Sequence, residues 1–207
     1  MIRKIYIRIM SGLFSKMQNA HREYLEMQYR NAKNVKLGEN VKFPFIKNGP
    51  PSCGKIVIGN NSWVCAAINM FPHNEEAILS IGEDCYIGDE SRIWCAKDIT
   101  IGNRVLIAHN VNIFDTTTHP FNKKERYEHE QIVKEYGLPK ELSQSISEAR
   151  VIIHDDVWIG CNCIILKGVE IGEGSIIAAG SVVTKNIPSN SMAAGNPAKV
   201  VKILKDN

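Results

Sequence analysis

Residues 151–185 read VIIHDDVWIGCNCIILKGVEIGEGSIIAAGSVVTK, and an aliphatic residue stands at every sixth position of this stretch. The aliphatic residues are Ile153, Ile159, Ile165, Ile171, Ile177 and Val183. Neither an α-helix, with its period of 3.6 residues, nor an ordinary alternating strand keeps a period of six over so long a stretch. A solenoid built from six-residue units does keep it.

The same period recurs upstream. It runs through Ile81, Ile87 and Ile93, slips by two residues, resumes at Ile101, Ile107 and Ile113, and starts weakly at Ile58 and Val64. Two positions before these aliphatic residues lies a second set of apolar or small residues: Leu79, Cys85, Ser91, Ile99, Val105, Val111, Val151, Val157, Cys163, Val169, Ser175 and Ser181. We expect both sets to point inward, because residues two apart on a strand share a face.

The repeat predicts an all-β domain over residues 31–190. Glycine most often follows the aliphatic residue and is itself followed by Asn, Asp or Glu, so we interpret these positions as turns that supply positive φ or side-chain-to-backbone hydrogen bonds. Three short strands per coil form a triangular prism of roughly five coils, stacked at about 4.8 Å. Each inward isoleucine contributes about 1.5–3 kcal/mol only when neighbouring coils cover it, so stacking is obligatory.

Composition agrees with a narrow aliphatic core. The chain has 207 residues, of which 44% are hydrophobic and 7% aromatic, and its net charge of +3 gives no general case for nucleic-acid binding. The six cysteines are Cys53, Cys65, Cys85, Cys95, Cys161 and Cys163. They lack zinc spacing and the sequence shows no secretion signal, so we expect reduced thiols and a cytoplasmic location.

Both ends depart from the repeat. In residues 1–30, apolar residues such as Ile5, Ile9 and Leu13 recur at helical spacing beside basic residues, which predicts an amphipathic helix. One alternative, which we favour, is that this helix caps the end of the prism. The other is that it touches the inner face of an anionic membrane. At residues 191–207 we expect a turn and a short helical tail, whose lysines either meet an anion or are simply solvated.

The repeat disappears in residues 114–150, an excursion rich in charge. A loop this long in a compact solenoid is usually functional. It begins with Phe114-Asp-Thr-Thr-Thr-His-Pro120, which would place the imidazole of His119 on a rigid base beside a mobile segment. This is a workable catalytic layout.

These motifs carry a resemblance to a known family. The hexapeptide repeat, Thr118-His119-Pro120, Asp156-Val-Trp-Ile-Gly160, Ala179-Gly-Ser-Val-Val-Thr-Lys185 and Ala194-Gly-Asn-Pro197 closely resemble the galactoside and maltose O-acetyltransferases, and capsule and lipopolysaccharide O-acetyltransferases share the pattern. The resemblance implies a left-handed parallel β-helix, a homotrimer, and acetyl-CoA bound in grooves between subunits. It implies no metal.

The chemistry needs one base. A sugar hydroxyl is a poor nucleophile and a thioester is a reactive electrophile, so the protein must chiefly remove the hydroxyl proton, a task that suits a neutral imidazole. We assign this task to His119, in agreement with the family's catalytic histidine. Asp115 would either hydrogen-bond the other ring nitrogen and fix the tautomer, or form a local Asx turn. No side chain has the setting of an activated covalent nucleophile.

The resemblance also implies binding residues. For acetyl-CoA these are Cys161, Ala179, Thr184, Lys185, Lys199 and Lys202. Trp158 would line the active-site groove, or else shield a subunit contact. The Asn and Asp that bind sugar in galactoside acetyltransferases are not matched, so Glu90, Arg92 and Trp94 form either a different acceptor wall or subunit contacts.

Three alternatives compete with acetyl transfer to a saccharide hydroxyl, for which we expect a surface-polysaccharide precursor as acceptor. A zinc enzyme of this fold would need a histidine spacing that His109, His119 and His154 do not match. Acetyl transfer to an amino sugar, or to the hydroxyl of an amino acid such as serine, would use the same base. A trimeric scaffold without activity would keep only the fold.

Overall fold

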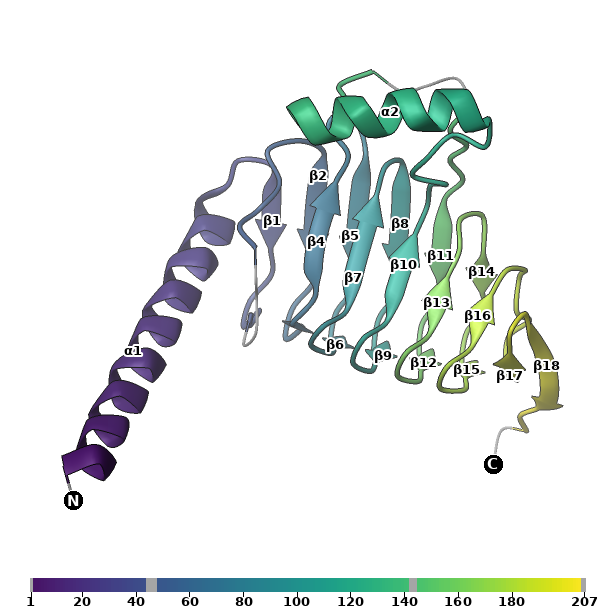
Figure 1. Ribbon diagram of the computed structural model, residues 1–207. Coiled ribbons are helices and arrows are strands. Elements are labelled where there is room, and N and C mark those ends of the chain that lie inside the picture. The colour runs from purple at the N-terminus through teal and green to yellow at the C-terminus, as the bar shows by residue number, and fades with distance from the viewer. Residues whose placement is uncertain (1, 44–47, 142–144, 206–207) are drawn as a thin grey trace.

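The chain forms a parallel β-solenoid with two helices, as the repeat predicts (Figure 1). The computed structural model describes the backbone of residues 2–43, 48–141 and 145–205, and side chains from Met10 onward. None of the helices in these ranges is long and apolar enough to cross a bilayer.

The strands form three sheets. Sheet 1 contains β1 (Val35–Leu37), β2 (Lys55–Ile58), β5 (Ile78–Ile81), β8 (Asp98–Ile101), β11 (Val151–Ile153) and β14 (Glu170–Ile171). Sheet 2 contains β3 (Trp63–Val64), β6 (Tyr86–Ile87), β9 (Leu106–Ile107), β12 (Trp158–Ile159), β15 (Ile176–Ile177), β17 (Ser191–Gly195) and β18 (Ala198–Ile203). Sheet 3 contains β4 (Ala67–Met70), β7 (Arg92–Cys95), β10 (Asn112–Phe114), β13 (Ile164–Ile165) and β16 (Val182–Val183).

Each coil takes one strand from each sheet in turn. Among the described residues, the complete coils are β2–β4, β5–β7, β8–β10, β11–β13 and β14–β16, and further strands flank them. We number the corners of the prism by the sheet that ends there: corner 2 leads from sheet 2 to sheet 3, and corner 3 leads from sheet 3 back to sheet 1.

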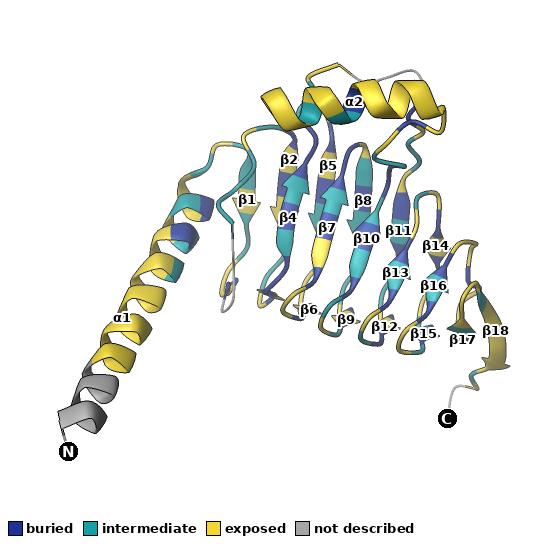
Figure 2. Ribbon diagram, viewed as in Figure 1, coloured by how far each residue is buried: buried dark blue, intermediate teal, exposed yellow. Residues whose placement is uncertain are grey.

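The predicted inward residues fill the core. Successive coils pair in register, so Ile87 lies against Ile107 and Ile107 against Ile159. All members of both predicted inward sets are buried, whereas residues between them, such as Tyr86 and Trp158, are exposed (Figure 2). The inward serines are satisfied across coils, as where the Ser91 hydroxyl donates to the Ala108 carbonyl and accepts from the Val111 N–H, both at 3.1 Å.

The glycines directly after the aliphatic residues are needed for a different reason from the one expected. Positive φ falls on the third residue after the aliphatic, for example Asp84 at 54° and Asn162 at 59°. The glycine directly after the aliphatic is needed because a Cβ there would collide with the next coil. At Gly82 it would lie 2.5 Å from the Gly102 carbonyl oxygen, and at Gly160 it would lie 2.6 Å from the Ala179 nitrogen.

Helix α1 (Ile2–Asn31) covers the first coil only with its last turns. Tyr29 is fully buried and packs on Phe43, with ring centroids 4.9 Å apart. Upstream, Leu13, Phe14 and Met17 are all more than half exposed, and the helix projects away from the prism (Figure 1).

The helical tail expected within residues 191–207 is wrong. Strands β17 and β18 form an antiparallel hairpin in which Gly195 pairs with Ala198. β17 also pairs with β15 and so extends sheet 2. β-Branched Val200, Val201 and Ile203 suit a strand, and the edge of β17 supplies the hydrogen-bonding partner that sequence periodicity does not reveal.

The excursion holds a helix as well as loop. Helix α2 (Lys123–Tyr136) begins at Asn122, whose side chain caps the N–H groups of Lys124 and Glu125. It lies across the prism near corner 3, above the ends of β5, β7 and β8 (Figure 1). The two legs of the excursion pair, because the Thr117 N–H donates to the Ser147 carbonyl at 3.0 Å.

Candidate active site

His119 lies on a tight turn at corner 3, where the chain leaves β10. The preceding Thr118 has a φ of 59°, and the His119 N–H donates to the Thr117 carbonyl at 2.6 Å. The Thr118 N–H donates to the Thr116 hydroxyl at 3.1 Å. These local bonds hold the backbone, and the side chain of His119 is exposed.

The ring of His119 meets a second histidine from α2. Its Nδ1 lies 3.3 Å from Nδ1 of His129, and the rings meet edge to face at 86° with centroids 5.2 Å apart. His129 is only 8% exposed. Burial lowers the pKa of His129, and the neighbouring His119 lowers it further. These effects favour the neutral form of His129.

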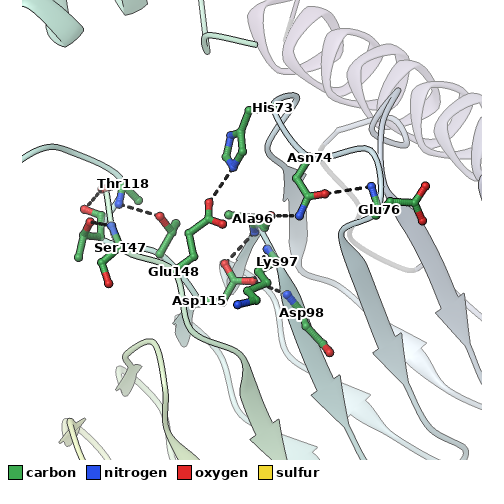
Figure 3. A network of polar contacts seen from close by, with 12 residues as sticks. His73, Asn74, Glu76, Ala96, Lys97, Asp98, Asp115, Thr118, Ser147 and Glu148 are labelled. Carbon is green, nitrogen blue, oxygen red and sulfur yellow. Dashed lines mark hydrogen bonds and ion pairs between the residues drawn. The ribbon is translucent and has the colours of Figure 1, made fainter. Parts of the chain in front are cut away.

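Asp115 does not orient His119, so the first of the two alternatives for this residue is wrong. The carboxylate is fully buried; Oδ1 accepts from the Ala96 N–H at 2.7 Å, and Oδ2 accepts from those of Lys97 and Asp98 at 2.7 and 2.8 Å (Figure 3). Burial raises its pKa, and these three N–H groups oppose that shift. Ala96 and Lys97 lie in the β7–β8 connection, where the repeat slips by two residues, and Asp98 begins β8, so Asp115 fixes the irregular coil.

A buried pair that the sequence did not reveal lies beside this segment. Nε2 of His73 lies 2.7 Å from Oε1 of Glu148, and the two side chains are 8% and 13% exposed (Figure 3). A small enclosed cavity beside the pair is lined by Phe71, His73, Thr116, Thr118, His129, Leu138, Pro139 and Ile146. His73 lies in the irregular connection between β4 and β5, outside the repeat. The sequence pattern therefore does not predict its contact with Glu148.

The candidate acceptor residues lie on or beside β7. Arg92 and Trp94 both face outward, and Glu90 lies at corner 2 with a φ of 57°. Trp94 packs between Phe71 and Phe114, with centroid distances of 6.0 and 6.3 Å. This aromatic row leads along sheet 3 towards the excursion.

The candidate acetyl-CoA residues are spread over two corners and one sheet end. Cys161 and Ala179 stack at corner 2, where the Gly180 N–H donates to the Cys161 carbonyl at 2.8 Å. Thr184 and Lys185 follow β16 at corner 3, the corner that carries His119. Trp158 faces outward on β12, and Lys199 and Lys202 are exposed on β18. One prism therefore does not gather these residues along a single edge.

His154 lies apart from this site. Nε2 of His154 lies 2.7 Å from Oε1 of Glu170 on the exposed side of sheet 1. Within the described ranges, His, Cys, Asp and Glu form no group of three or more that could hold a metal ion.

Two family models match the solenoid on either side of the excursion. One, described as bacterial transferase hexapeptide (six repeats), matches residues 150–185. The other, described as hexapeptide repeat of succinyl-transferase, matches residues 78–114.

Curated relatives include O- and N-acetyltransferases. Galactoside O-acetyltransferase of Escherichia coli (strain K12) is 35% identical over 149 residues, which are 72% of this chain and 64% of the relative. The enzyme of the same name from Lactococcus lactis is 39% identical over 110 residues, 53% of this chain and 45% of the relative. A 2,3,4,5-tetrahydropyridine-2,6-dicarboxylate N-acetyltransferase of Staphylococcus aureus is 54% identical over 56 residues, 27% of this chain and 23% of the relative. The chain spans less than two thirds of the length of each.

Solved structures share the fold. A hexapeptide-repeat acetyltransferase from Vibrio cholerae, complexed with acetyl coenzyme A, matches with a TM-score of 0.53 at 23% identity, over 86% of this chain and 75% of that chain. An N-acyltransferase from Bacillus cereus, a mutant in complex with dTDP-4-amino-4,6-dideoxyglucose and coenzyme A, matches with a TM-score of 0.63 at 18% identity, over 87% of this chain and 89% of that chain. The repeat, the solenoid and these comparisons make the chain similar to hexapeptide-repeat acetyltransferases.

Proposed function

We propose that the protein transfers the acetyl group of acetyl-CoA to a hydroxyl of a saccharide, with His119 as general base. The observation that carries the proposal is the exposed His119 side chain, with Nδ1 engaged by His129. Its Nε2 has no hydrogen-bond partner among the described residues, so it is free to accept a proton. General-base catalysis of this kind contributes roughly 10²–10⁴ in rate.

The reaction needs no covalent enzyme intermediate. The acceptor hydroxyl gives its proton to Nε2 of His119 as its oxygen attacks the thioester carbonyl, which forms a tetrahedral intermediate. Collapse of the intermediate breaks the carbon–sulfur bond and expels the CoA thiolate. The thiolate takes the proton from the imidazolium, which restores neutral His119.

The galactoside O-acetyltransferase relatives support a saccharide acceptor, and we place the product in surface-polysaccharide synthesis. The row formed by Phe71, Trp94 and Phe114 suits the apolar face of a sugar ring, and Arg92 and Glu90 lie beside it.

Acetyl transfer to an amine is the second candidate. It is favoured by the N-acetyltransferase relative and by the structural neighbour whose bound ligand is a nucleotide-linked amino sugar. Labelled acetyl-CoA with sugar pairs that differ only in a hydroxyl or an amine at one carbon separates the two. Transfer to the hydroxyl member supports the proposal, whereas exclusive transfer to the amine member contradicts it.

We propose that the acetyl-CoA site is completed by a second protomer of a homotrimer. Cys161 and Ala179 lie at corner 2, whereas Thr184 and Lys185 share corner 3 with His119, so one cofactor contacts both sets only where two prisms meet. Lys199 and Lys202 would hold its phosphates by charge. No metal takes part in this scheme.

An apolar ladder on sheet 2 fits the subunit contact. Trp63, Tyr86, Leu106 and Trp158 pair in register, face outward, and are 42%, 41%, 45% and 50% exposed. Leu106→Glu should give monomers in light scattering, because a charge would be buried at the interface. Ile132→Glu on α2 is the matched control. A trimeric Leu106→Glu protein, or a monomeric wild type, contradicts the assignment.

We also propose a cytoplasmic location in which the projecting part of α1 contacts anionic lipid. Its exposed apolar residues include Leu13, Phe14 and Met17, and Lys16 lies among them. Sedimentation with phosphatidylglycerol vesicles should fall for Phe14→Glu. Failure of the wild type to sediment with them refutes this contact.

A further inference from the structure

We propose that His129 is a positioning residue that accepts the Nδ1–H of His119 and thereby keeps Nε2 of His119 free to take the acceptor's proton. The inference deepens the proposed function and rests on it. It gives His129 the orienting task that was one of the two alternatives for Asp115, whose two carboxylate oxygens are occupied by backbone N–H groups.

The geometry allows one proton between the rings. The contact joins Nδ1 to Nδ1 at 3.3 Å, so in a neutral pair exactly one ring donates. If His129 donates, the proton of His119 sits on Nε2 and that atom cannot act as a base. If His119 donates, its Nε2 carries a lone pair. Only the second arrangement is competent for the proposed reaction.

Protonation of His119 fixes which ring donates the hydrogen bond between the two histidines during the reaction. When Nε2 of His119 accepts the acceptor's proton, both nitrogens of that ring carry hydrogen, so His119 must donate through Nδ1. His129 is 8% exposed and His119 is exposed, so the charge resides on His119. The bond becomes charge-assisted as the charge develops, which stabilises the transition state more than the ground state.

The fold holds His129 in place. It lies within α2, which is capped by Asn122 at its start and by Gly137 at its end. Its charged or titratable neighbours on the inner side are His73, in the wall of the enclosed cavity, and Glu148, which is bonded to His73. On the outer side a groove contains His129 with Glu125, Glu128, Tyr136, Lys140 and Glu141, and Glu130 follows His129 in the helix.

Two variants and a control test the assignment. His129→Leu removes the acceptor, and His129→Gln supplies a carbonyl oxygen in its place. Tyr127→Leu replaces an exposed aromatic residue on the same helix that lines neither the groove nor the enclosed cavity, and serves as the control. We expect kcat to fall about 10- to 100-fold in His129→Leu, the size of one hydrogen bond to a charged group, with the KM for acetyl-CoA unchanged. His129→Gln should recover part of the loss, and Tyr127→Leu should match wild type.

Nitrogen-15 NMR of histidine-labelled protein reads the tautomer without any turnover. At a pH where both rings are neutral, Nδ1 of His119 should resonate as a protonated nitrogen and Nε2 as an unprotonated one, and His129→Leu should shift His119 towards the other tautomer. A wild-type His119 protonated at Nε2, or a folded His129→Leu protein with wild-type kcat, overturns the inference. Full activity in His119→Ala, with the expected tautomer in the wild-type spectrum, instead overturns the proposed function and with it the catalytic purpose of the contact, while the assignment of His129 as the acceptor of the Nδ1–H of His119 stands.

Discussion

Replacing Asp115 by Asn separates a structural carboxylate from a catalytic one. The side chain keeps its size and loses one acceptor oxygen and its charge. In the wild type, Asp115 accepts three backbone N–H bonds of 2.7–2.8 Å from Ala96, Lys97 and Asp98. An amide satisfies only one side of this arrangement, because its NH2 group must face a backbone donor.

The expected loss follows from those contacts. Hydrogen bonds to a charged acceptor contribute about 1.5–3 kcal/mol each, and a buried donor left without a partner costs about 1–3 kcal/mol. If the amide oxygen faces Lys97 and Asp98, the Ala96 N–H is the group left unpaired. Asp115→Asn should therefore lower the free energy of unfolding by about 2–4 kcal/mol. Turnover per folded molecule should stay within about threefold of wild type, because Asp115 does not touch His119.

Urea unfolding at fixed protein concentration measures the first quantity, and steady-state kinetics below the transition measures the second. Asp156→Asn is the matched control, because its carboxylate pairs with Arg104 at an exposed corner and should contribute within about 1 kcal/mol. A thousandfold loss of kcat with unchanged unfolding would refute the structural role and restore an orienting one.

Three further outcomes follow from the same structure. Ile159→Ala, in the centre of the core, should cost about 2–5 kcal/mol by urea unfolding, whereas Val57→Ala on the outer face should cost less than about 1 kcal/mol; equal losses would contradict the assigned faces. Gly82→Ala should destabilise the fold by more than about 1 kcal/mol, because the new Cβ would lie 2.5 Å from backbone of the next coil. Gly12→Ala in α1 is the control and should stabilise the protein slightly, because no atom lies within 4 Å of its new Cβ. A Gly82→Ala protein with wild-type stability would show that the coils can separate. Because the folded-state pKa of His129 lies below that of the unfolded chain, its contribution to stability is present above about pH 6.5 and is lost as the pH falls towards the folded-state pKa. The His129→Leu protein should therefore lose less stability than wild type between pH 7 and pH 5, and parallel curves would exclude this titration.

The buried core positions could be predicted from the sequence because the six-residue period alone identifies which residues point inward. No knowledge of the distant residues that they contact is needed. Ile153 and Val183 are buried for the same local reason. The sequence also singles out the glycines that follow several of these aliphatic residues, but it does not reveal why they are needed, since the close approach of Gly82 to Gly102 exists only between coils. Periodicity gave the right residue there and the wrong physical reason.

The rest depends on contacts between segments far apart in sequence. Asp115 reaches back to the slip in the repeat, His73 meets Glu148, and His119 meets His129 on a helix that begins after a loop. Each lies outside the repeat, where spacing carries no information on what a side chain touches. The hairpin of β17 and β18 was missed for a related reason, because a strand at the end of a solenoid is defined by the edge it pairs with.

The most direct test of the general-base role is the turnover of His119→Ala with acetyl-CoA and its best saccharide acceptor, measured beside the calorimetric affinity for acetyl-CoA. A proton acceptor used only in the chemical step predicts a fall in kcat of roughly 10²–10⁴ with the affinity for acetyl-CoA unchanged. Turnover within a few fold of wild type would contradict it.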